Sequence, residues 1–324
     1  MSFENIIGQH RAIRAIENII SQGQLRGSYL FLGPDGVGKR TVALELAKAI
    51  NCEAPLETKD TCSCASCKKI TSGNHPDVFL ISPEGASYSI KIAKVRDIIY
   101  QASLKPYEGK KRVFIIDDAL EMTEEAQNAL LKVLEEPPER HIFILVASKV
   151  AGFLPTVISR CRILKFHPVK QSEIQDFLKN RDVDEDGAVL FSHMAMGSIG
   201  RALEYIEGDI IPRREQVVND FFLRKSVLLR ESSLNENVSD DVEESLFMLL
   251  CWYRDLLVAN FTDEKDLLLN IDRSEEISSY ANRFSKLKLE KDISAIIKTI
   301  NYVRSNINPK IALFEMAKEL QKKC

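Results

Sequence analysis

The chain lacks any long apolar run. Nowhere in its 324 residues do about 18 consecutive apolar residues occur, which is the length that a membrane-spanning helix requires. The first residues, MSFENIIGQH, include the charged Glu4 and lack the apolar stretch of a signal peptide. Internal repeats and low-complexity segments are also absent. These absences predict a cytoplasmic protein without a membrane partner, and a hydrophobic content of 45% is typical of a globular protein.

An excess of one charge is missing too. The chain has 44 Lys and Arg residues against 47 Asp and Glu residues, a formal net charge of -3. Such a balance excludes a polyanion-binding surface over the whole molecule, so contact with nucleic acid would depend on a local patch or on partner proteins. Lys110, Lys111 and Arg112 form a short basic run. We interpret them as solvated loop charges, with contact to a nucleic-acid backbone as the alternative.

Cysteine, in contrast, is concentrated in one place. Four of the seven cysteines, Cys52, Cys62, Cys64 and Cys67, lie in one short stretch. In a reducing compartment such a cluster more often binds a metal than forms disulfides. The knuckle C-x-C-x₂-C supplies three thiolates and Cys52 a fourth, which leaves no open coordination position, so we predict a structural Zn²⁺ site. Free thiols are the alternative, and His75 is an alternative ligand in place of Cys62.

Apolar, β-branched runs alternate with helical patterns through the first half of the chain. The runs are SYLFLG, DVFLIS, RVFIIDD, HIFILVAS and RILKF, and amphipathic stretches such as EEAQNALLKVLEE lie between them. This alternation predicts a parallel sheet covered by helices. Further along, only helical periodicity remains. Pro168 and the polar break GDIIPRR divide the chain into an α/β domain (1–167), a small helical domain (168–208) and a C-terminal helical bundle (209–324).

Residues 33–41, GPDGVGKRT, match the phosphate-binding pattern G-x-x-x-x-G-K between a strand-like run and a helical pattern. Gly33, Gly36 and Gly38 would let backbone N–H groups surround phosphate oxygens, and Lys39 would reach the outer phosphates. The sequence therefore predicts an ATP-binding loop. A glycine-rich strand-to-helix turn without a ligand is the alternative.

Two positions of this site depart from a hydrolysing pattern. Arg40 stands where a Ser or Thr hydroxyl would bind Mg²⁺, and Thr41 lies about 100° further around the helix. Asp117 ends the run RVFIIDD, where a carboxylate holds Mg²⁺, but Asp118 replaces the Glu that polarises the attacking water. The two acids could also be a plain strand-end pair. ATP binding is thus expected, whereas Mg²⁺-dependent hydrolysis is in doubt.

Taken together, these motifs resemble the clamp-loader branch of AAA+ proteins. The matching segments are FENIIGQHRAI, GPDGVGKRT, the cysteine cluster, NHPDV, VRDIIYQASLKPYEGKKRVFIIDDA, EEAQNALLKVLEEPP, LPTVISRCR and NPKIALFEMAKEL. The resemblance implies an AAA+ P-loop domain with a zinc module at 52–67, a helical lid and a C-terminal collar. Relatives usually space the zinc ligands C-x₂-C-x₂-C, which makes Cys62 the least secure ligand of this chain.

The resemblance also implies roles for single residues. Ile7 matches the segment that lines the adenine pocket, and Ser148 matches a sensor of the γ-phosphate. Ser159, Arg160 and Cys161 match a triplet at the subunit interface, whose arginine reaches into the ATP site of the neighbouring subunit and neutralises charge on the transferred phosphoryl group.

The same resemblance distinguishes two roles within a clamp loader. Three positions of this chain's own ATP site depart from the ATP-hydrolysing pattern: Arg40, Asp118 and Gly200. Gly200 stands where such subunits have a sensing arginine. The arginine that would serve a neighbouring subunit, Arg160, is present. We therefore expect little or no ATPase activity and a stator that joins gamma/tau and delta subunits in a hetero-pentamer and helps to load the sliding clamp onto primed DNA. A motor ATPase of the same complex is the alternative. A zinc-stabilised ATP-binding scaffold outside replication is a third hypothesis.

Overall fold

The structure is a computed structural model. It describes residues 3, 6–54, 62, 64–85, 88–208, 210–219, 238–305 and 307–321. The chain forms two compact units. The first comprises Met1–Phe177 with Gly197–Arg201, and the second comprises Leu178–Met196 with Ala202–Cys324. The three-domain division drawn from the sequence stays a prediction.

The first unit is built on a five-stranded parallel sheet in the order β2-β3-β4-β1-β5. The strands are β1 (Gly27–Leu32), β2 (Val78–Ile81), β3 (Arg112–Ile116), β4 (His141–Ala147) and β5 (Arg162–Lys165). Every residue of β3 and β4 is buried, as near-continuous apolar runs require when both faces of a sheet are covered. The predicted parallel sheet flanked by helices is confirmed.

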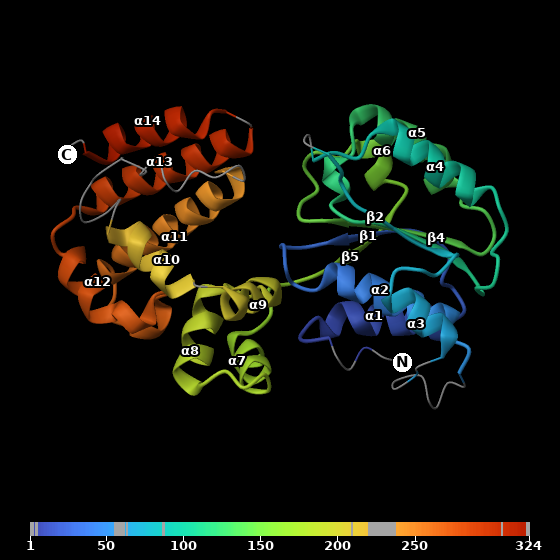
Figure 1. The fold of residues 1–324 in the computed structure, drawn as a ribbon, viewed down its shortest axis with the longest axis horizontal. Coiled ribbons are helices and arrows are strands. Elements are labelled where there is room, and N and C mark those ends of the chain that lie inside the picture. The colour runs from blue at the N-terminus through green and yellow to red at the C-terminus, as the bar shows by residue number, and fades with distance from the viewer. Residues whose placement is uncertain are drawn as a thin grey trace. The chain divides into compact units, whose positions relative to one another are not determined.

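Helices cover both faces of this sheet (Figure 1). One face packs against α1 (His10–Ser21), α2 (Lys39–Asn51) and α3 (Ala65–Thr71), and the other against α4 (Ile92–Ala102), α5 (Glu124–Glu135) and α6 (Pro155–Ile158). A short 3₁₀ turn, η2 (Ala119–Glu121), follows β3. Strand residues alternate between the two hydrophobic cores: Phe31 faces one and Leu30 the other.

The carboxyl ends of the strands bring four loops together. The N–H group of Gly33 donates to Ala147 at 3.1 Å, and that of Phe166 donates to Leu32 at 2.7 Å. The loops after β1, β3, β4 and β5 therefore share one edge of the sheet. Since β1 lies between β4 and β5 while β2 lies at the far edge, the chain order reverses beside β1, which is where open α/β sheets bind ligands.

After β5 the described part of the chain is helical. The helices are α7 (Gln171–Lys179), α8 (Glu185–Met194), α9 (Ile199–Glu207), α10 (Ile210–Val217), α11 (Val238–Ala259), α12 (Ser274–Ala281), α13 (Lys286–Arg304) and α14 (Pro309–Gln321), with 3₁₀ turns η5 (Lys265–Leu267) and η6 (Ile271–Arg273). Trp252 of α11 is fully buried in the second unit. The predicted helical C-terminal region is confirmed. Among the described residues, no helix has both the length and the apolarity to cross a bilayer.

Candidate functional site

The loop between β1 and α2 contains the predicted phosphate-binding glycines. Gly36 and Gly38 have φ angles of 71° and 96°, which glycine adopts without strain. Gly33 lies so close to the chain after β5 that a Cβ atom there would be 2.4 Å from the carbonyl oxygen of Phe166. Gly38 is also the N-cap of α2, so the unpaired N–H groups of the first helical turn lie at this loop.

Lys39 is turned back onto its own loop. Its Nζ atom donates to the carbonyl oxygens of Gly33 at 2.5 Å and Pro34 at 2.6 Å, and lies 3.4 Å from Oδ1 of Asp35. The residue is 6% exposed. Burial lowers the pKa of Lys39, and the Asp35 carboxylate opposes that shift. A phosphate group would have to replace the two carbonyl oxygens as the partner of this ammonium group.

Arg40 pairs with the carboxylate that the sequence assigns to Mg²⁺. Its Nη1 atom lies 3.3 Å from Oδ2 of Asp117, which follows β3 directly. Burial, together with the neighbouring Asp118, raises the pKa of Asp117, and Arg40 opposes this shift. Thr41 is exposed in the first turn of α2. The guanidinium group therefore supplies the positive charge at the place where Asp117 would otherwise meet a cation.

Asp118 also has a partner within the chain. The hydroxyl group of Tyr88 donates to its Oδ2 atom at 2.8 Å, and this bond raises the pKa of Tyr88 to about 12. The φ angles of Tyr88 and Asp118 are 38° and 45°, in the left-handed region that few residues other than glycine occupy. Sequence reasoning missed Tyr88, because a tyrosine in a connecting loop carries no pattern that marks it.

Residues 197–201 lie on the phosphate-binding loop. The N–H group of Gly200 donates to the carbonyl oxygen of Gly36 at 2.9 Å. A Cβ atom on Gly200 would be 3.1 Å from Cα of Gly36, and one on Gly36 would be 2.1 Å from Oγ of Ser198. The N–H group of Arg201 donates to the same Ser198 oxygen at 3.2 Å. Glycine at position 200 thus permits a backbone contact that a side chain would obstruct.

Gln9 fixes the segment that was expected to line the adenine pocket. Its Nε2 atom donates to the carbonyl oxygens of Val37 at 3.2 Å and His167 at 2.6 Å, and its Oε1 atom accepts from the N–H group of His167 at 3.0 Å. Ile7, two positions earlier, is half-buried. Ser148 follows β4 directly and is half-buried too. Gln9 was not predicted, since its partners are distant in the sequence.

The triplet of Ser159, Arg160 and Cys161 follows α6. Ser159 is the C-cap of this helix, and its hydroxyl group donates to the carbonyl oxygen of Thr156 at 3.1 Å. The side chain of Arg160 is 28% exposed and pairs with Glu135 of α5 at 2.6 Å. Cys161 packs against the sheet core, and burial raises its pKa to about 12. A raised pKa keeps this thiol in its neutral form at neutral pH, which suits a residue that packs in the core.

Gln127 of α5 holds the beginning of the segment that carries this triplet. Its Oε1 atom accepts from the N–H group of Leu154 at 2.9 Å, and its Nε2 atom donates to the carbonyl oxygens of Gly152 at 3.1 Å and Met122 at 3.3 Å. Gln127 is 3% exposed, and all of its polar atoms have partners. This buried amide fixes α6 to α5. The sequence contained no sign of this contact.

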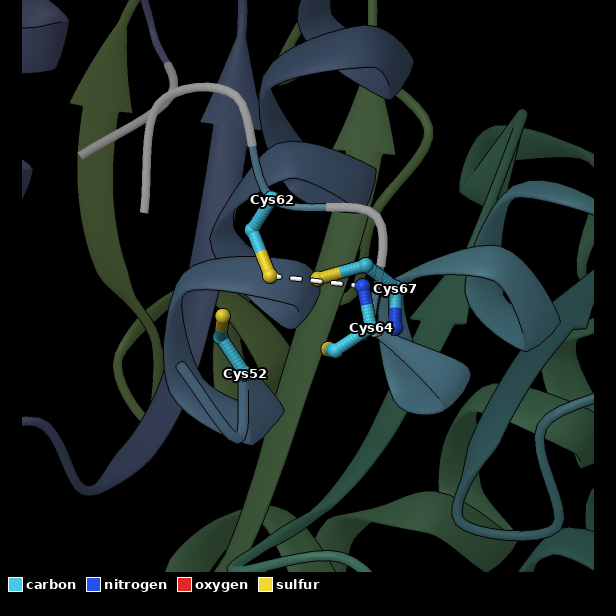
Figure 2. A group of neighbouring side chains, drawn as sticks. All are labelled: Cys52, Cys62, Cys64 and Cys67. Atoms are coloured by element: carbon cyan, nitrogen blue, oxygen red, sulfur yellow. Dashed lines mark hydrogen bonds between the residues drawn. The ribbon is translucent and has the colours of Figure 1, made fainter. Parts of the chain in front are cut away.

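Four cysteine sulfurs meet between α2 and α3 (Figure 2). Cys52 follows α2 as its C-cap, Cys64 is the N-cap of α3, and Cys67 lies within α3. Together with Cys62, their sulfur atoms all lie within 4.8 Å of one another. Tetrahedral Zn²⁺ with Zn–S bonds of about 2.3 Å separates its ligand sulfurs by about 3.8 Å, so this set fits the ion. Burial disfavours the Cys64 thiolate, but the N–H group of Cys67 and further hydrogen bonds lower the pKa of Cys64 to about 6.

His75 does not belong to this cluster. Its Nδ1 atom accepts from the N–H group of Asp77 at 3.1 Å, so Nε2 carries the proton of the neutral ring and lies 3.1 Å from Oγ of Ser66. Burial lowers the pKa of His75. Both ring nitrogens are therefore used in the fold, and the fourth sulfur comes from Cys62.

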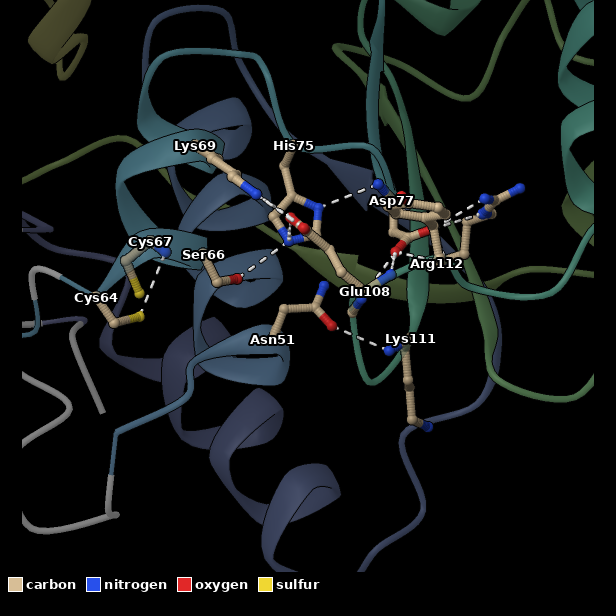
Figure 3. Close-up of polar contacts among 12 residues, drawn as sticks. Asn51, Cys64, Ser66, Cys67, Lys69, His75, Asp77, Glu108, Lys111 and Arg112 are labelled. Atoms are coloured by element: carbon tan, nitrogen blue, oxygen red, sulfur yellow. Dashed lines mark hydrogen bonds and ion pairs between the residues drawn. The ribbon is translucent and has the colours of Figure 1, made fainter.

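A buried ion pair joins Asp77 to Arg112 (Figure 3). Asp77 has no exposed surface, and its carboxylate accepts from Nε of Arg112 at 3.0 Å and from the N–H groups of Tyr107, Glu108 and Gly109 at 2.8 Å. Burial alone would raise the pKa of this carboxyl group, but the backbone donors and Arg112 lower the pKa of Asp77. The loop that leads into β3 is thereby fixed at one point.

This arrangement corrects the interpretation of the basic run. Arg112 is the first residue of β3 and is 4% exposed, so it is no solvated loop charge. Lys111 donates from Nζ to the carbonyl oxygen of Leu25. Lys110 donates from Nζ to the carbonyl oxygen of Cys52 at 2.6 Å. The three basic residues bind groups of this chain, and the last of them is neutralised by a buried carboxylate.

Comparisons with known proteins give matches over most of the chain. A family model described as DNA polymerase III, delta subunit, matches residues 8–170, and one described as DNA polymerase III, delta subunit, C terminal, matches residues 211–322. DNA polymerase III subunit delta' of Bacillus subtilis (strain 168) is 32% identical over 312 residues, which cover 93% of this chain and 92% of that protein. The chain belongs to the DNA polymerase III delta-prime family. The resemblance to clamp-loader AAA+ proteins is confirmed.

Relatives with other subunit names also match. DNA polymerase III subunit tau of Bacillus subtilis is 33% identical over 261 residues, and the match spans 74% of this chain but 45% of tau. The crystal structure of a DNA polymerase III gamma subunit-related protein from Thermotoga maritima has a TM-score of 0.50 and 19% identity, and the match covers 95% of this chain and 99% of that one. At this identity the likeness shows the fold alone.

Proposed function

We propose that this chain is a clamp-loader subunit that does not turn over ATP itself and that supplies Arg160 to the ATP site of an adjacent subunit. The observation that supports this role is the state of the chain's own site. Lys39 is bonded to carbonyl oxygens of its loop, and Arg40 is paired with Asp117. Each of these bonds must break before phosphate and Mg²⁺ take their usual places.

The lid segment supports the same conclusion. In subunits that hydrolyse ATP, an arginine near position 200 would sense the γ-phosphate, but here Gly200 contacts Gly36 of the loop directly. This contact packs the lid segment onto the loop, and the absence of a side chain at position 200 lets the two backbones approach closely. ATP is a candidate ligand, and Mg²⁺ would have to compete with Arg40 for the Asp117 carboxylate.

Arg160 is the group that acts on chemistry elsewhere. It lies at the surface after α6 and carries a permanent positive charge. An arginine supplied by a neighbour stabilises charge on the transferred phosphoryl group and is worth about 10³ to 10⁵ in kcat in GTPases. Ser159 and Cys161 flank it, the first as a helix cap and the second as a buried anchor.

The proposed partners are gamma/tau and delta subunits in a hetero-pentamer that loads the sliding clamp onto primed DNA in the cytoplasm. The names of the matching relatives support this assembly. The four cysteines hold a structural Zn²⁺, which would join the end of α2 to α3 and stabilise the fold without taking part in catalysis.

The test is the substitution Arg160→Ala in a complex reconstituted with gamma/tau and delta subunits. The DNA-stimulated ATPase rate should fall while the complex still assembles, because the partners that Arg160 would leave, Glu135 and Thr156, are exposed to water. Arg14→Ala, an exposed arginine of α1 on the other face of the sheet, is the matched control and should leave the rate unchanged. An intact Arg160→Ala complex with the wild-type rate would contradict the proposal.

A motor ATPase of the same complex is the second candidate. Gly33, Lys39 and Asp117 are in the expected order around β1 and β3, and relatives named gamma and tau match this chain. Steady-state ATP turnover by the isolated chain, abolished by Lys39→Ala, would favour this candidate over the first.

A further inference from the structure

Glu135, the last residue of α5, makes a two-point contact with the side chain of Arg160. Both Nε and Nη2 of Arg160 donate to the same atom, Oε2 of Glu135, at 2.9 Å and 2.6 Å. The Nη1 atom donates to the carbonyl oxygen of Thr156 at 3.0 Å. Every nitrogen of the guanidinium group therefore has a partner within this chain, and the plane of the group is fixed by two elements, α5 and α6.

These contacts leave a defined part of the guanidinium group available. The group has five N–H donors: one on Nε and two on each terminal nitrogen. Glu135 takes the Nε donor and one donor of Nη2, and Thr156 takes one donor of Nη1. Among the described residues, one N–H group on each terminal nitrogen has no partner. Charged N–H donors of a guanidinium group bind phosphate oxygens, so these two remain available for such a contact.

Helix α5 holds both ends of the segment that carries Arg160. Gln127 binds the N–H group of Leu154 at the start of α6, and Glu135 binds Arg160 behind its end. The two side chains lie on one helix about two turns apart, so their positions relative to each other are rigid. Arg160 is thus positioned by α5 as well as by its own backbone.

We propose that Glu135 is a positioning residue for Arg160. It binds one edge of the guanidinium group and thereby presents the two terminal N–H groups to a phosphate oxygen of a nucleotide held by an adjacent subunit. This inference rests on the proposed role of Arg160 in such a site. Without Glu135, the side chain would lose its orientation and would sample several rotamers before each encounter with phosphate.

The expected loss of ATPase rate in Glu135→Ala is set by the exposure of Glu135. Glu135 is 57% exposed, so its ion pair with Arg160 is screened by water and salt. We expect Glu135→Ala to lower kcat of the DNA-stimulated ATPase by about two- to five-fold in the reconstituted complex, with KM for ATP nearly unchanged. Glu135→Gln, which keeps an acceptor oxygen but no charge, should have a smaller effect that disappears at high salt.

Glu136→Gln is the matched control. Glu136 is the exposed neighbour at the C-cap of α5, and the hydrogen bonds of the Arg160 side chain within the described residues go to Glu135 and Thr156 instead. Glu136→Gln removes the same charge as Glu135→Gln. It should leave kcat at the wild-type value. In the Arg160→Ala background, Glu135→Ala should cause no further loss, because a positioning residue acts only through the group that it positions.

The outcomes separate this inference from the proposed function. A wild-type rate for Arg160→Ala contradicts the proposed function itself. A lowered rate for Arg160→Ala with a wild-type rate for Glu135→Ala overturns only the role of Glu135. The role of Glu135 is also overturned if Glu135→Ala lowers the rate as much in the Arg160→Ala background as it does in the wild type.

A measurement on the isolated chain does not depend on assembly. The Nε–H signal of Arg160 in a ¹⁵N spectrum is assigned by its loss in Arg160→Ala. The Nε proton should exchange faster with water in Glu135→Ala than in the wild type, and its exchange rate should be unchanged in Glu136→Gln. An Arg160 signal that is identical in the wild type and in Glu135→Ala would also overturn the inference.

Discussion

Replacement of Asp77 by Asn should strongly destabilise the first unit. The Oδ1 atom of Asp77 accepts from Arg112, and Oδ2 accepts from the N–H groups of Glu108 and Gly109. An Asn side chain has an N–H₂ group in place of one of these oxygens, so in either orientation it would direct donors toward donors. Arg112, which is 4% exposed, would in addition remain buried beside a neutral group.

The expected cost is large compared with the stability of a domain. Removal of one partner of a buried ion pair costs about 3–5 kcal/mol, whereas whole domains are stable by about 5–15 kcal/mol. For a urea m-value of about 2 kcal/mol/M, the midpoint should fall by about 1.5–2.5 M. The pKa of Asp77 is lowered in the fold, so its stabilisation is complete above the unfolded pKa of about 3.9 and is lost as the pH falls through the folded value. Asp77→Asn should lack this part of the acid sensitivity.

The two units offer separate signals for the assay. Trp252 is the single tryptophan and is buried in the second unit, so its fluorescence reports on that unit, whereas far-UV circular dichroism reports on both. In urea titrations Asp77→Asn should move the circular dichroism transition and leave the Trp252 transition in place. Asp97→Asn, at an exposed position of α4, should shift the free energy of unfolding by less than about 0.5 kcal/mol. Equal, small shifts for both variants would refute the reasoning.

Three further substitutions test other parts of the structure. Cys67→Ser should abolish Zn²⁺ binding, measured by metal analysis of the purified chain, and should lower Tm. Cys251→Ser is the control and should leave the metal content unchanged. Equal metal content in both variants would contradict the four-cysteine Zn²⁺ site. Gly200→Ala places a Cβ atom 3.1 Å from Cα of Gly36 and should lower the free energy of unfolding, measured by thermal denaturation, by about 1–3 kcal/mol. An unchanged free energy of unfolding would mean that the two segments are not closely packed at this contact. Arg40→Ser should release Asp117 and supply a hydroxyl ligand for Mg²⁺. Calorimetry with ADP should then show an affinity that rises with Mg²⁺ in the variant but not in the wild type. The same Mg²⁺ dependence in both proteins would show that Arg40 does not prevent Mg²⁺ binding.

The sheet was predictable because its strands are buried on both faces. RVFII and HIFILVA are near-continuous apolar runs whose residues are all buried, and such runs are visible without any alignment. The helices of the first unit that were predicted, such as α5, have an apolar stripe at helical spacing. Short helices such as α3 were not predicted, because the cysteine cluster, and not an apolar stripe, determines where α3 begins.

The groups that hold the site in place were not predictable in the same way. Gln9 and His167 are separated by 158 positions, and Asp77 and Arg112 by 35, so no local pattern connects them. A short basic run before a strand predicts solvated loop charges, but a distant carboxylate neutralises the last member of this run. Tyr88 and Glu135 are ordinary residues in their sequence context, and only the fold brings them to Asp118 and Arg160.

The central claim is that the catalysis assisted by this chain takes place in the ATP site of a neighbour. Its most direct test compares two variants in one reconstituted complex by steady-state, DNA-stimulated ATP hydrolysis. Lys39→Ala, which alters the chain's own loop, should leave the rate of the assembled complex near the wild-type value, and Arg160→Ala should lower it. A complex that loses activity with Lys39→Ala and keeps it with Arg160→Ala would contradict the account.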